Sequence, residues 1–238
     1  MSSTREAVLA RIAQALADVP ASETPDGDDV PRDYRAVSTA PDPVALFVER
    51  VAGHGASVIR TTRAQVAGTI AAALAERPPG GVVVPPGFPE RLLPQGRFTR
   101  LGDVPPLSPV ALDAAAAVLT TAAVGIAVTG TVILDAGPGQ GRRALSLLPD
   151  HHICVVREDQ IVGDVPEALS RLDPTAPLTF VSGPSATSDI ELDRIEGVHG
   201  PRTLDVIVVA ARSAEEPSVA ARPAEEPSVA ARSTEEPS

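Results

Sequence analysis

Short apolar runs and helix-periodic segments alternate along this chain from about residue 43 to residue 209, and this alternation constrains its fold more than any other feature. Strands are expected at residues 56–60, 81–84, 123–127, 132–134, 153–156, 179–181 and 204–209. Helices are expected at residues 43–52, 63–77 and 112–119. Strands that alternate with helices of this size favour parallel pairing with both sheet faces covered. The sequence therefore predicts an α/β fold with a parallel or mostly parallel sheet.

Two appendages are expected to flank this α/β domain, which spans residues 37–209. Residues 1–36 begin with capping-box spacing between Ser3 and Glu6, continue as a short amphipathic helix and end in an acidic linker. A helix this short is marginal in water, so we expect it to dock on its own domain, on a second copy of the chain or on a partner. Residues 210–238 repeat a ten-residue unit. Each unit contains a proline and little apolar bulk, which predicts a disordered tail.

Composition excludes several kinds of chemistry. The chain has no lysine, because all 20 basic residues are arginine, so it has no Schiff-base or Walker-type lysine. Its single cysteine, Cys154, lies in an apolar run and is expected in the core, since one thiol cannot hold an iron–sulfur cluster. No partner ligand follows His151 and His152 at useful spacing, so no metal is expected there. We expect no cofactor.

Charge and hydropathy set the expected environment. The net charge of −11 and the scarcity of aromatic residues argue against nucleic acid as a partner. Residues 114–134 carry no charge, but they are rich in alanine and lack flanking anchors, so they are expected to be buried in the protein rather than in a membrane. No segment has the pattern of a signal peptide. The chain is therefore expected to be cytoplasmic.

Two loops beside expected strands are candidates for binding a small polar ligand. The first holds Thr129, Gly130 and Thr131, whose hydroxyls and flexible backbone suit a ligand, although a tight hairpin turn explains them equally well. The second contains Gly183, Pro184, Ser185 and Thr187, and leads from a strand into an expected helix. Free amides at that helix start would suit a carboxylate or a phosphate.

The segment after the second loop has its own alternatives. Ser188 and Glu191 have capping-box spacing, which favours a structural role at the helix start. His199 follows a helix stop at Gly197, and with Asp189 or Glu191 near in space it would form an acid/base pair. The alternative is a turn histidine that hydrogen-bonds to the backbone.

A glycine-rich segment at residues 137–143 ends in two arginines. It lacks the lysine and the strand-to-helix context of a phosphate-binding loop, so a mobile loop is expected. Arg142 and Arg143 would then be available to pair with an acidic substrate or a partner protein.

The order of three motifs resembles the LUD-domain family, to which the C-type lactate utilization proteins belong. The motifs are Thr129-Gly-Thr131, the run from Gly183 to Glu191, and Gly197-Val-His-Gly-Pro201. Relatives carry a glutamate before the Thr-Gly-Thr motif, whereas this chain has Val128. The resemblance implies an open three-layer α/β/α sheet like that of ribose-phosphate isomerases and CoA transferases.

Two function classes follow from this resemblance. In the first, the chain is an accessory, non-redox subunit of an L-lactate oxidation system, whose partners carry the iron–sulfur clusters, and it binds a small carboxylate. In the second, it is an enzyme that acts on a phosphorylated or CoA-linked metabolite, an alternative that rests on fold analogy alone. Val128, together with the missing lysines and cysteines, favours the first.

Overall fold

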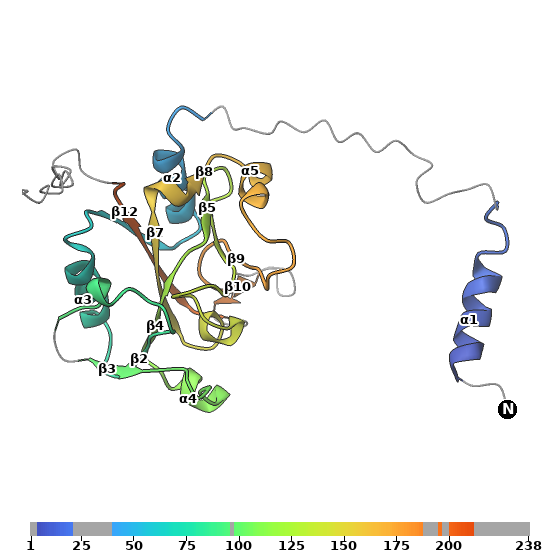
Figure 1. Cartoon of the computed structure of the whole chain (residues 1–238), viewed down its shortest axis with the longest axis horizontal. Coiled ribbons are helices and arrows are strands. Elements are labelled where there is room, and N and C mark those ends of the chain that lie inside the picture. The colour runs from blue at the N-terminus through green and yellow to red at the C-terminus, as the bar shows by residue number, and fades with distance from the viewer. Residues whose placement is uncertain (1–3, 21–39, 96–97, 188–194, 197–199, 212–238) are drawn as a thin grey trace, which may run out of the picture. The chain divides into compact units, whose positions relative to one another are not determined.

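A six-stranded parallel sheet forms the centre of the molecule. The computed structural model describes most of the chain, namely residues 4–20, 40–95, 98–187, 195–196 and 200–211. Every neighbouring pair of strands in the central sheet is parallel, and the strand order is β1-β12-β7-β4-β2-β3 (Figure 1). The strands are β1 (Ser57–Thr61), β2 (Gly81–Val83), β3 (Thr99–Leu101), β4 (Ala117–Thr121), β7 (His151–Arg157) and β12 (Thr203–Val209). The predicted α/β fold with an open parallel sheet is confirmed.

Three of the predicted strands belong to a second, four-stranded sheet and not to the central sheet. The order of this second sheet is β8-β5-β6-β9, with β5 at Val124–Ile126, β6 at Thr131–Leu134, β8 at Ile161–Val162 and β9 at Thr179–Val181. β6 pairs antiparallel with both β5 and β9. The turn between β5 and β6 is too short for a parallel crossover, which is why these segments form a hairpin. The expectation of one sheet is therefore wrong for this part of the chain.

Helices and the second sheet cover the two faces of the central sheet. Helix α3 (Val66–Ala75) packs on the face that carries Ile153 and Ile207. The neighbouring residues Cys154 and Val206 point to the other face, because side chains alternate along a strand. There they pack against helix α2 (Pro43–Gly53) and the second sheet. Helix α5 (Val165–Ser170) packs against the opposite face of the second sheet.

The predicted helix at residues 112–119 is wrong. Helix α4 is limited to Pro109–Asp113, where Ser108 Oγ caps the Ala111 amide at 3.2 Å, and β4 begins at Ala117. β4 lies between β2 and β7, and four of its five residues are buried. Burial between two strands outweighs the helix propensity of alanine, which is a weak local preference.

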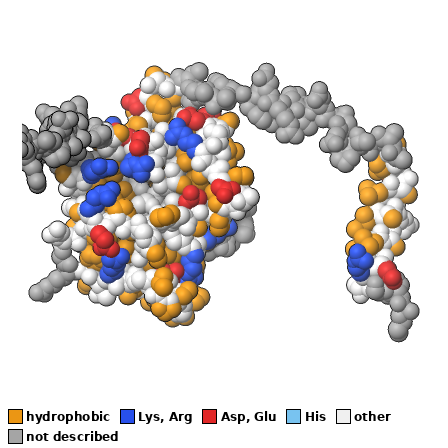
Figure 2. Space-filling view, in the orientation of Figure 1, with side chains coloured by type: hydrophobic (Ala, Val, Ile, Leu, Met, Phe, Trp, Pro, Cys, Tyr) orange, Lys and Arg blue, Asp and Glu red, His pale blue; other side chains and the backbone are white. Residues whose placement is uncertain are grey.

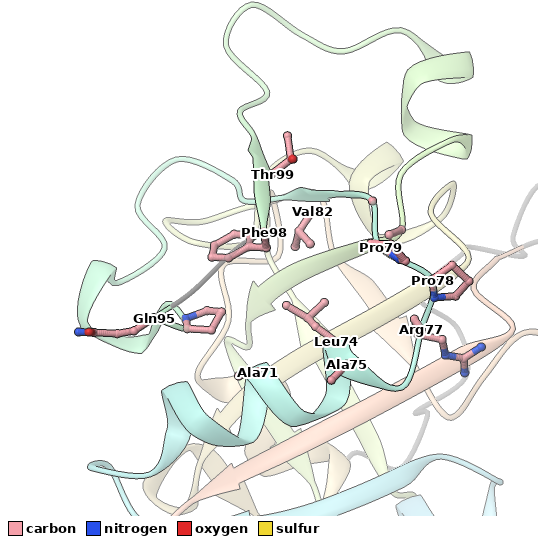
Figure 3. Close-up of a pocket in the computed structure, with 13 residues that line it drawn as sticks. Ala71, Leu74, Ala75, Arg77, Pro78, Pro79, Val82, Gln95, Phe98 and Thr99 are labelled. Carbon is pink, nitrogen blue, oxygen red and sulfur yellow. The ribbon is translucent and has the colours of Figure 1, made fainter.

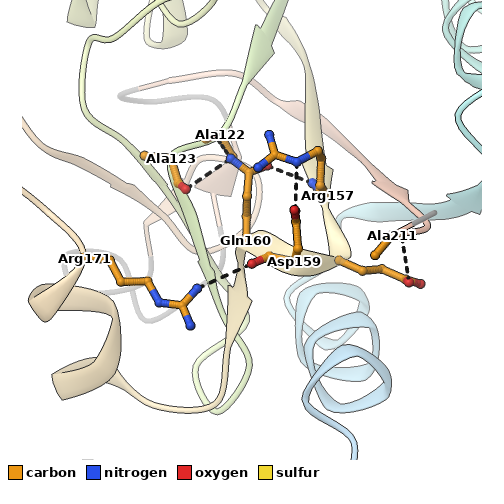
Figure 4. A network of polar contacts seen from close by, with 8 residues as sticks. Ala122, Ala123, Arg157, Asp159, Gln160, Arg171 and Ala211 are labelled. Carbon is orange, nitrogen blue, oxygen red and sulfur yellow. Dashed lines mark hydrogen bonds and ion pairs between the residues drawn. The ribbon is translucent and has the colours of Figure 1, made fainter. Parts of the chain in front are cut away.

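One glutamine side chain joins the two sheets. Gln160 closes the 3₁₀ helix η3 (Glu158–Gln160) after β7, and its Nε2 donates to the Ala122 carbonyl at 2.7 Å and the Ala123 carbonyl at 3.2 Å (Figure 4). These two carbonyls lie where the chain leaves β4 for β5. Gln160 Oε1 accepts from the Arg157 amide at 3.0 Å. The Gln160 side chain thus links the C-terminal end of β7 to the segment that leads into the second sheet.

The remaining described elements are short. They are the 3₁₀ helices η1 (Glu90–Leu92) and η2 (Arg143–Ser146), and the strands β10 (Ala186–Thr187) and β11 (Ile195–Glu196), which pair antiparallel. A helix running up to Gly197 was expected from the sequence. It is wrong at Ile195–Glu196, because these residues pair as a strand.

The N-terminal residues form a compact unit of their own. The predicted helix is confirmed as α1 (Thr4–Ala15), and none of its residues is buried within the structure. Val8 and Ile12 expose 51% and 50% of their surface, and apolar side chains cover much of the visible helix face (Figure 2).

Within the described residues, no helix is both long and apolar enough to cross a membrane. The predicted disordered tail lies outside the described residues from residue 212 onward.

Candidate functional site

The Thr129–Thr131 segment is the turn of the β5–β6 hairpin. Gly130 has a φ of 59°, in the left-handed region, and a Cβ at this position would lie 2.7 Å from the Arg50 carbonyl carbon of α2. Both the positive φ and the close approach exclude a larger residue. The turn therefore packs closely on the last turn of α2. The hairpin interpretation of this motif is confirmed, because β5 and β6 pair antiparallel on either side of it.

Three hydroxyl groups meet at this turn. Thr129 Oγ1 lies 2.7 Å from Thr131 Oγ1, which in turn lies 2.8 Å from Ser182 Oγ, just after β9. Thr131 is buried, with 4% of its surface exposed, whereas Thr129 and Ser182 are exposed. Since a hydroxyl both donates and accepts, the three form a chain with both ends open to solvent.

A histidine that the sequence analysis did not select completes this group. His54 caps the C-terminus of α2, and its Nε2 lies 2.9 Å from the Thr129 carbonyl oxygen. Because a carbonyl only accepts, Nε2 carries the proton in this bond. We call Thr129, Thr131, Ser182 and His54 the hydroxyl cluster. The helix stop at His54-Gly55 was the signal in the sequence that could have identified His54.

The second predicted loop lies beside the first. Gly183 has a φ of 101°, and a Cβ there would lie 2.7 Å from His54 Cβ, so this loop packs directly on the hydroxyl cluster. Ser185 follows Pro184 and donates its amide to the Pro201 carbonyl at 2.8 Å. A Cβ on Gly200 would lie 3.3 Å from Ser185 Cβ.

The outer part of that loop departs from expectation. Thr187 belongs to the short strand β10 and pairs with Ile195, instead of leading into a helix. Asp189 and His199 lie outside the described residues, as do Ser188 and Glu191. The structure thus brings the Thr129–Thr131 turn together with Ser182–Gly183.

The hydroxyl cluster lies near the amino ends of central strands. His54 precedes β1 by a few residues, and Pro201 leads into β12. Open parallel sheets usually bind ligands at the opposite, carboxyl edge. The site therefore depends on the second sheet, which supplies Thr129, Thr131 and Ser182, and not on the carboxyl ends of the central strands.

The glycine-rich segment packs over the carboxyl ends of β2 and β4. Gly139 donates its amide to the Pro86 carbonyl at 2.8 Å and accepts from the Thr121 amide at 2.9 Å. Gln140 is buried and accepts from the Asp135 amide at 2.6 Å. The expectation of a mobile loop is therefore wrong, because its backbone is hydrogen-bonded to two strand ends.

Arg142, at the end of this loop, is held by an acidic side chain of the protein itself. Its guanidinium makes two bonds to Asp103, at 2.8 Å and 3.0 Å, and a third to the Leu107 carbonyl at 2.7 Å. The hydrogen bonds from Arg142 hold the pKa of Asp103 below its usual value, although burial of the carboxyl opposes this. Arg142 is thus engaged within the fold, while Arg143 stays exposed.

Strand β7 carries the buried titratable side chains His151, His152 and Cys154. His152 Nε2 lies 2.7 Å from Thr120 Oγ1, and burial lowers the pKa of His152 to about 4. Burial also raises the pKa of Cys154 to about 12, so the thiol stays protonated at neutral pH. His151 Nε2 lies 2.7 Å from Asp205 Oδ2 across the β7–β12 pair. Within the described residues, no group of three or more His, Cys, Asp or Glu is arranged to hold a metal ion.

Comparison with known proteins places the chain in a family. The LUD-domain family profile matches residues 110–209. A lactate utilization protein C from Deinococcus radiodurans is 53% identical over 167 residues, which cover 68% of this chain and 77% of that protein. This chain belongs to the LUD-domain family. A lactate utilization protein C from Halalkalibacterium halodurans is 35% identical, over 40% of this chain and 44% of its own length.

A solved structure of a DUF162 family protein has a similar fold. The crystal structure of a DUF162 family protein from Deinococcus radiodurans matches with a TM-score of 0.59 and 45% identity, over 70% of this LUD-domain chain and 96% of the other. The matched LUD region contains three members of the hydroxyl cluster, but His54 lies before it. Val128, where the resemblance led us to expect glutamate, is 46% exposed beside Thr129.

Proposed function

We propose that this LUD-domain protein is an accessory, non-redox subunit of a cytoplasmic system that oxidises L-lactate to pyruvate. The observation that supports this most strongly is its 53% identity over 77% of a protein named lactate utilization protein C. The redox chemistry is assigned to iron–sulfur subunits on which this chain docks. We further propose that the fold is a variant of the open α/β/α type of ribose-phosphate isomerases and CoA transferases, supported by the parallel central sheet with both faces covered.

In this proposal, the hydroxyl cluster holds a small carboxylate. Thr129 and Ser182 lie at the exposed ends of the hydroxyl chain and would donate to the ligand, while buried Thr131 fixes their spacing. Gly183, Pro184, Ser185 and Thr187 would form one wall of the site. Val128 leaves an exposed apolar side chain beside Thr129, where the resemblance led us to expect a glutamate, so acid–base chemistry at this site would fall to other residues.

Asp189 and His199 are proposed as an acid/base pair that serves this site. The pair follows from the family resemblance, and Gly200, a described residue, lies against Ser185 of the second loop. Their proposed role is to exchange a proton with the bound hydroxy or keto acid.

Helix α1 is proposed to dock on a second copy of the chain or on a partner subunit. Its large apolar side chains are about half exposed, and an isolated helix of 12 residues is marginal in water. Hydrogen exchange of the full chain, alone and with the iron–sulfur subunits, tests this. Unprotected amides in α1 under both conditions would refute the docking of the helix.

Growth of a deletion strain on lactate tests the function. The strain is expected to fail on lactate as sole carbon source, to grow on glucose, and to recover when the full chain is returned. Retention of the iron–sulfur subunits by the tagged chain checks the subunit role. Undiminished growth of the deletion strain on lactate would overturn the proposed function.

Variants of the hydroxyl cluster test the site separately. Thr129→Val and Ser182→Ala remove hydroxyls at exposed positions and are expected to slow growth on lactate in variants that remain folded, which their melting temperatures check. Thr175→Val is a matched control, because Thr175 is also an exposed loop threonine with a side-chain hydrogen bond, to Asp173. If the double variant of Thr129 and Ser182 grew like the control, the cluster would have no part in the function.

A further inference from the structure

A carboxylate at the hydroxyl cluster would need a cation from a neighbouring element. The hydroxyls of Thr129, Thr131 and Ser182 carry no charge, and His54 Nε2 already donates to the Thr129 carbonyl at 2.9 Å. The chain as a whole carries a net charge of −11, which repels an approaching anion unless positive charge lies close to the site. The elements that pack on the cluster are therefore where such a cation is expected.

Arg50 of α2 lies one helical turn before His54. Residues four positions apart share a helix face, so Arg50 lies on the side of α2 that meets the β5–β6 turn. A Cβ on Gly130 would lie 2.7 Å from Arg50 Cβ, which places the base of the Arg50 side chain against the backbone between Thr129 and Thr131. Arg50 is exposed, so a ligand at the turn can reach its guanidinium.

The side chain of Arg50 has no partner within the part of the chain that the structure describes. Other arginines there are held by the fold: Arg142 is bound by Asp103, and Arg77, which lines a hollow of about 470 Å³ beside α3 (Figure 3), donates to Thr203 Oγ1. Arg50, by contrast, makes no ion pair or side-chain hydrogen bond with any described residue. Its charge is therefore available to a ligand.

The position of Arg50 also suits the binding of an anion. The last carbonyls of a helix carry partial negative charge, which would repel a carboxylate beside the end of α2. Arg50 is the basic residue in the last turn of α2, and its charge offsets this repulsion. A guanidinium also presents paired donors that match the two oxygens of a carboxylate. An uncharged ligand would gain much less from this group.

We propose that Arg50 binds the carboxylate of the ligand at the hydroxyl cluster, and that Thr129 and Ser182 then donate to its 2-hydroxy or 2-keto oxygen. This inference rests on the proposed function, because it adds a binding residue to the site that the proposed function assigns to this cluster. It gives the site a preference for short 2-hydroxy and 2-keto acids over their uncharged amides.

Titration of the ¹⁵N-labelled full chain with L-lactate tests this proposal. L-lactate is expected to shift the amide signals of Gly130 and Gly183, and lactamide, its uncharged amide, should bind more weakly. Arg50→Gln should weaken L-lactate binding by about tenfold or more, through loss of a charge-assisted contact, and leave lactamide binding unchanged. Arg63→Gln is the matched control and should bind L-lactate as the parent chain does. Arg63 is also exposed and without a partner among the described residues, but it follows the carboxyl end of β1, away from the cluster.

Four results would overturn the role of Arg50. They are no binding of L-lactate to the parent chain, parent-like binding by Arg50→Gln, equal weakening in Arg63→Gln, or lactamide binding as tight as that of L-lactate. Melting temperatures show whether each variant is folded. If Arg50→Gln does not fold, Arg50→Met replaces it, because methionine keeps an aliphatic stem against Gly130 but carries no charge.

The deletion strain separates this inference from the proposed function. If the strain fails to grow on lactate but L-lactate binding does not depend on Arg50, the role of Arg50 is overturned and the subunit role stands. If the strain grows normally on lactate while Arg50→Gln loses L-lactate binding, the subunit role is overturned and the binding role of Arg50 stands.

Discussion

Acid is expected to destabilise this protein through one buried histidine, His152. Its side chain is 1% exposed, and burial, with a smaller effect of neighbouring His151, lowers its pKa to about 4 in the folded state. In the unfolded chain the pKa returns to about 6.5. At pH 7 the imidazole is neutral in both states, so it contributes nothing to the pH dependence there. Below about pH 6.5 the unfolded state takes up a proton that the folded state does not.

The magnitude follows from the difference between the two pKa values. Because one pKa unit corresponds to about 1.4 kcal/mol, the free energy of unfolding should fall by about 2 kcal/mol between pH 7 and pH 5 from this group alone. The full loss, reached near pH 4, is about 3 kcal/mol, a large share of the roughly 5–15 kcal/mol that stabilises a typical domain.

Urea unfolding of the parent chain and of His152→Gln measures this effect. Glutamine can still reach Thr120 Oγ1 but does not titrate, so the variant should lose about 2 kcal/mol less than the parent between pH 7 and pH 5. Carboxyl groups such as Asp103 and Asp150 have lowered pKa values, so they titrate at a pH below this range. Both proteins contain these groups, so they do not contribute to the difference between the two pH profiles. Parallel pH profiles for the two proteins would refute the argument.

Three further predictions follow from the described contacts. Cys154 is expected to react with iodoacetamide only after unfolding, because it is buried and its pKa is raised to about 12; fast alkylation of the native chain would contradict this. Gln160→Ala should lower the free energy of unfolding by roughly 1–3 kcal/mol, because it leaves the Ala122 carbonyl without the donor from Gln160. An unchanged midpoint of urea unfolding would show that this side chain does not help to hold the two sheets together. Truncation after Ala211 should leave the melting temperature unchanged, and a fall of several degrees would show that the repeats pack on the domain.

Local patterns in the sequence predicted much of the fold. The apolar runs that became β7 and β12 were predicted because strands buried on both faces are nearly continuous in apolar residues. The alanine-rich segment before Thr121 was misassigned as a helix. Its strand conformation results from pairing with β2 and β7, which are distant in sequence. Local propensity could not indicate those partners.

The candidate site was predicted in part for a similar reason. Thr129, Gly130 and Thr131 were selected because hydroxyls and glycine beside a strand suit a ligand, and they do lie next to Gly183. His54 was not selected, because its contact with Thr129 joins residues 75 positions apart. The sequence also did not indicate that Arg142 is bound by Asp103 within the same chain.

The sequence by itself determined the α/β class and the approximate positions of the seven strands predicted from apolar runs, since both depend on patterns within a few residues. Tertiary structure alone decided the division into two sheets and the position of the hydroxyl cluster near the amino ends of central strands. It also decided the lowered pKa of His152. These features depend on which distant segments exclude water from one another, and that is a property of packing in three dimensions.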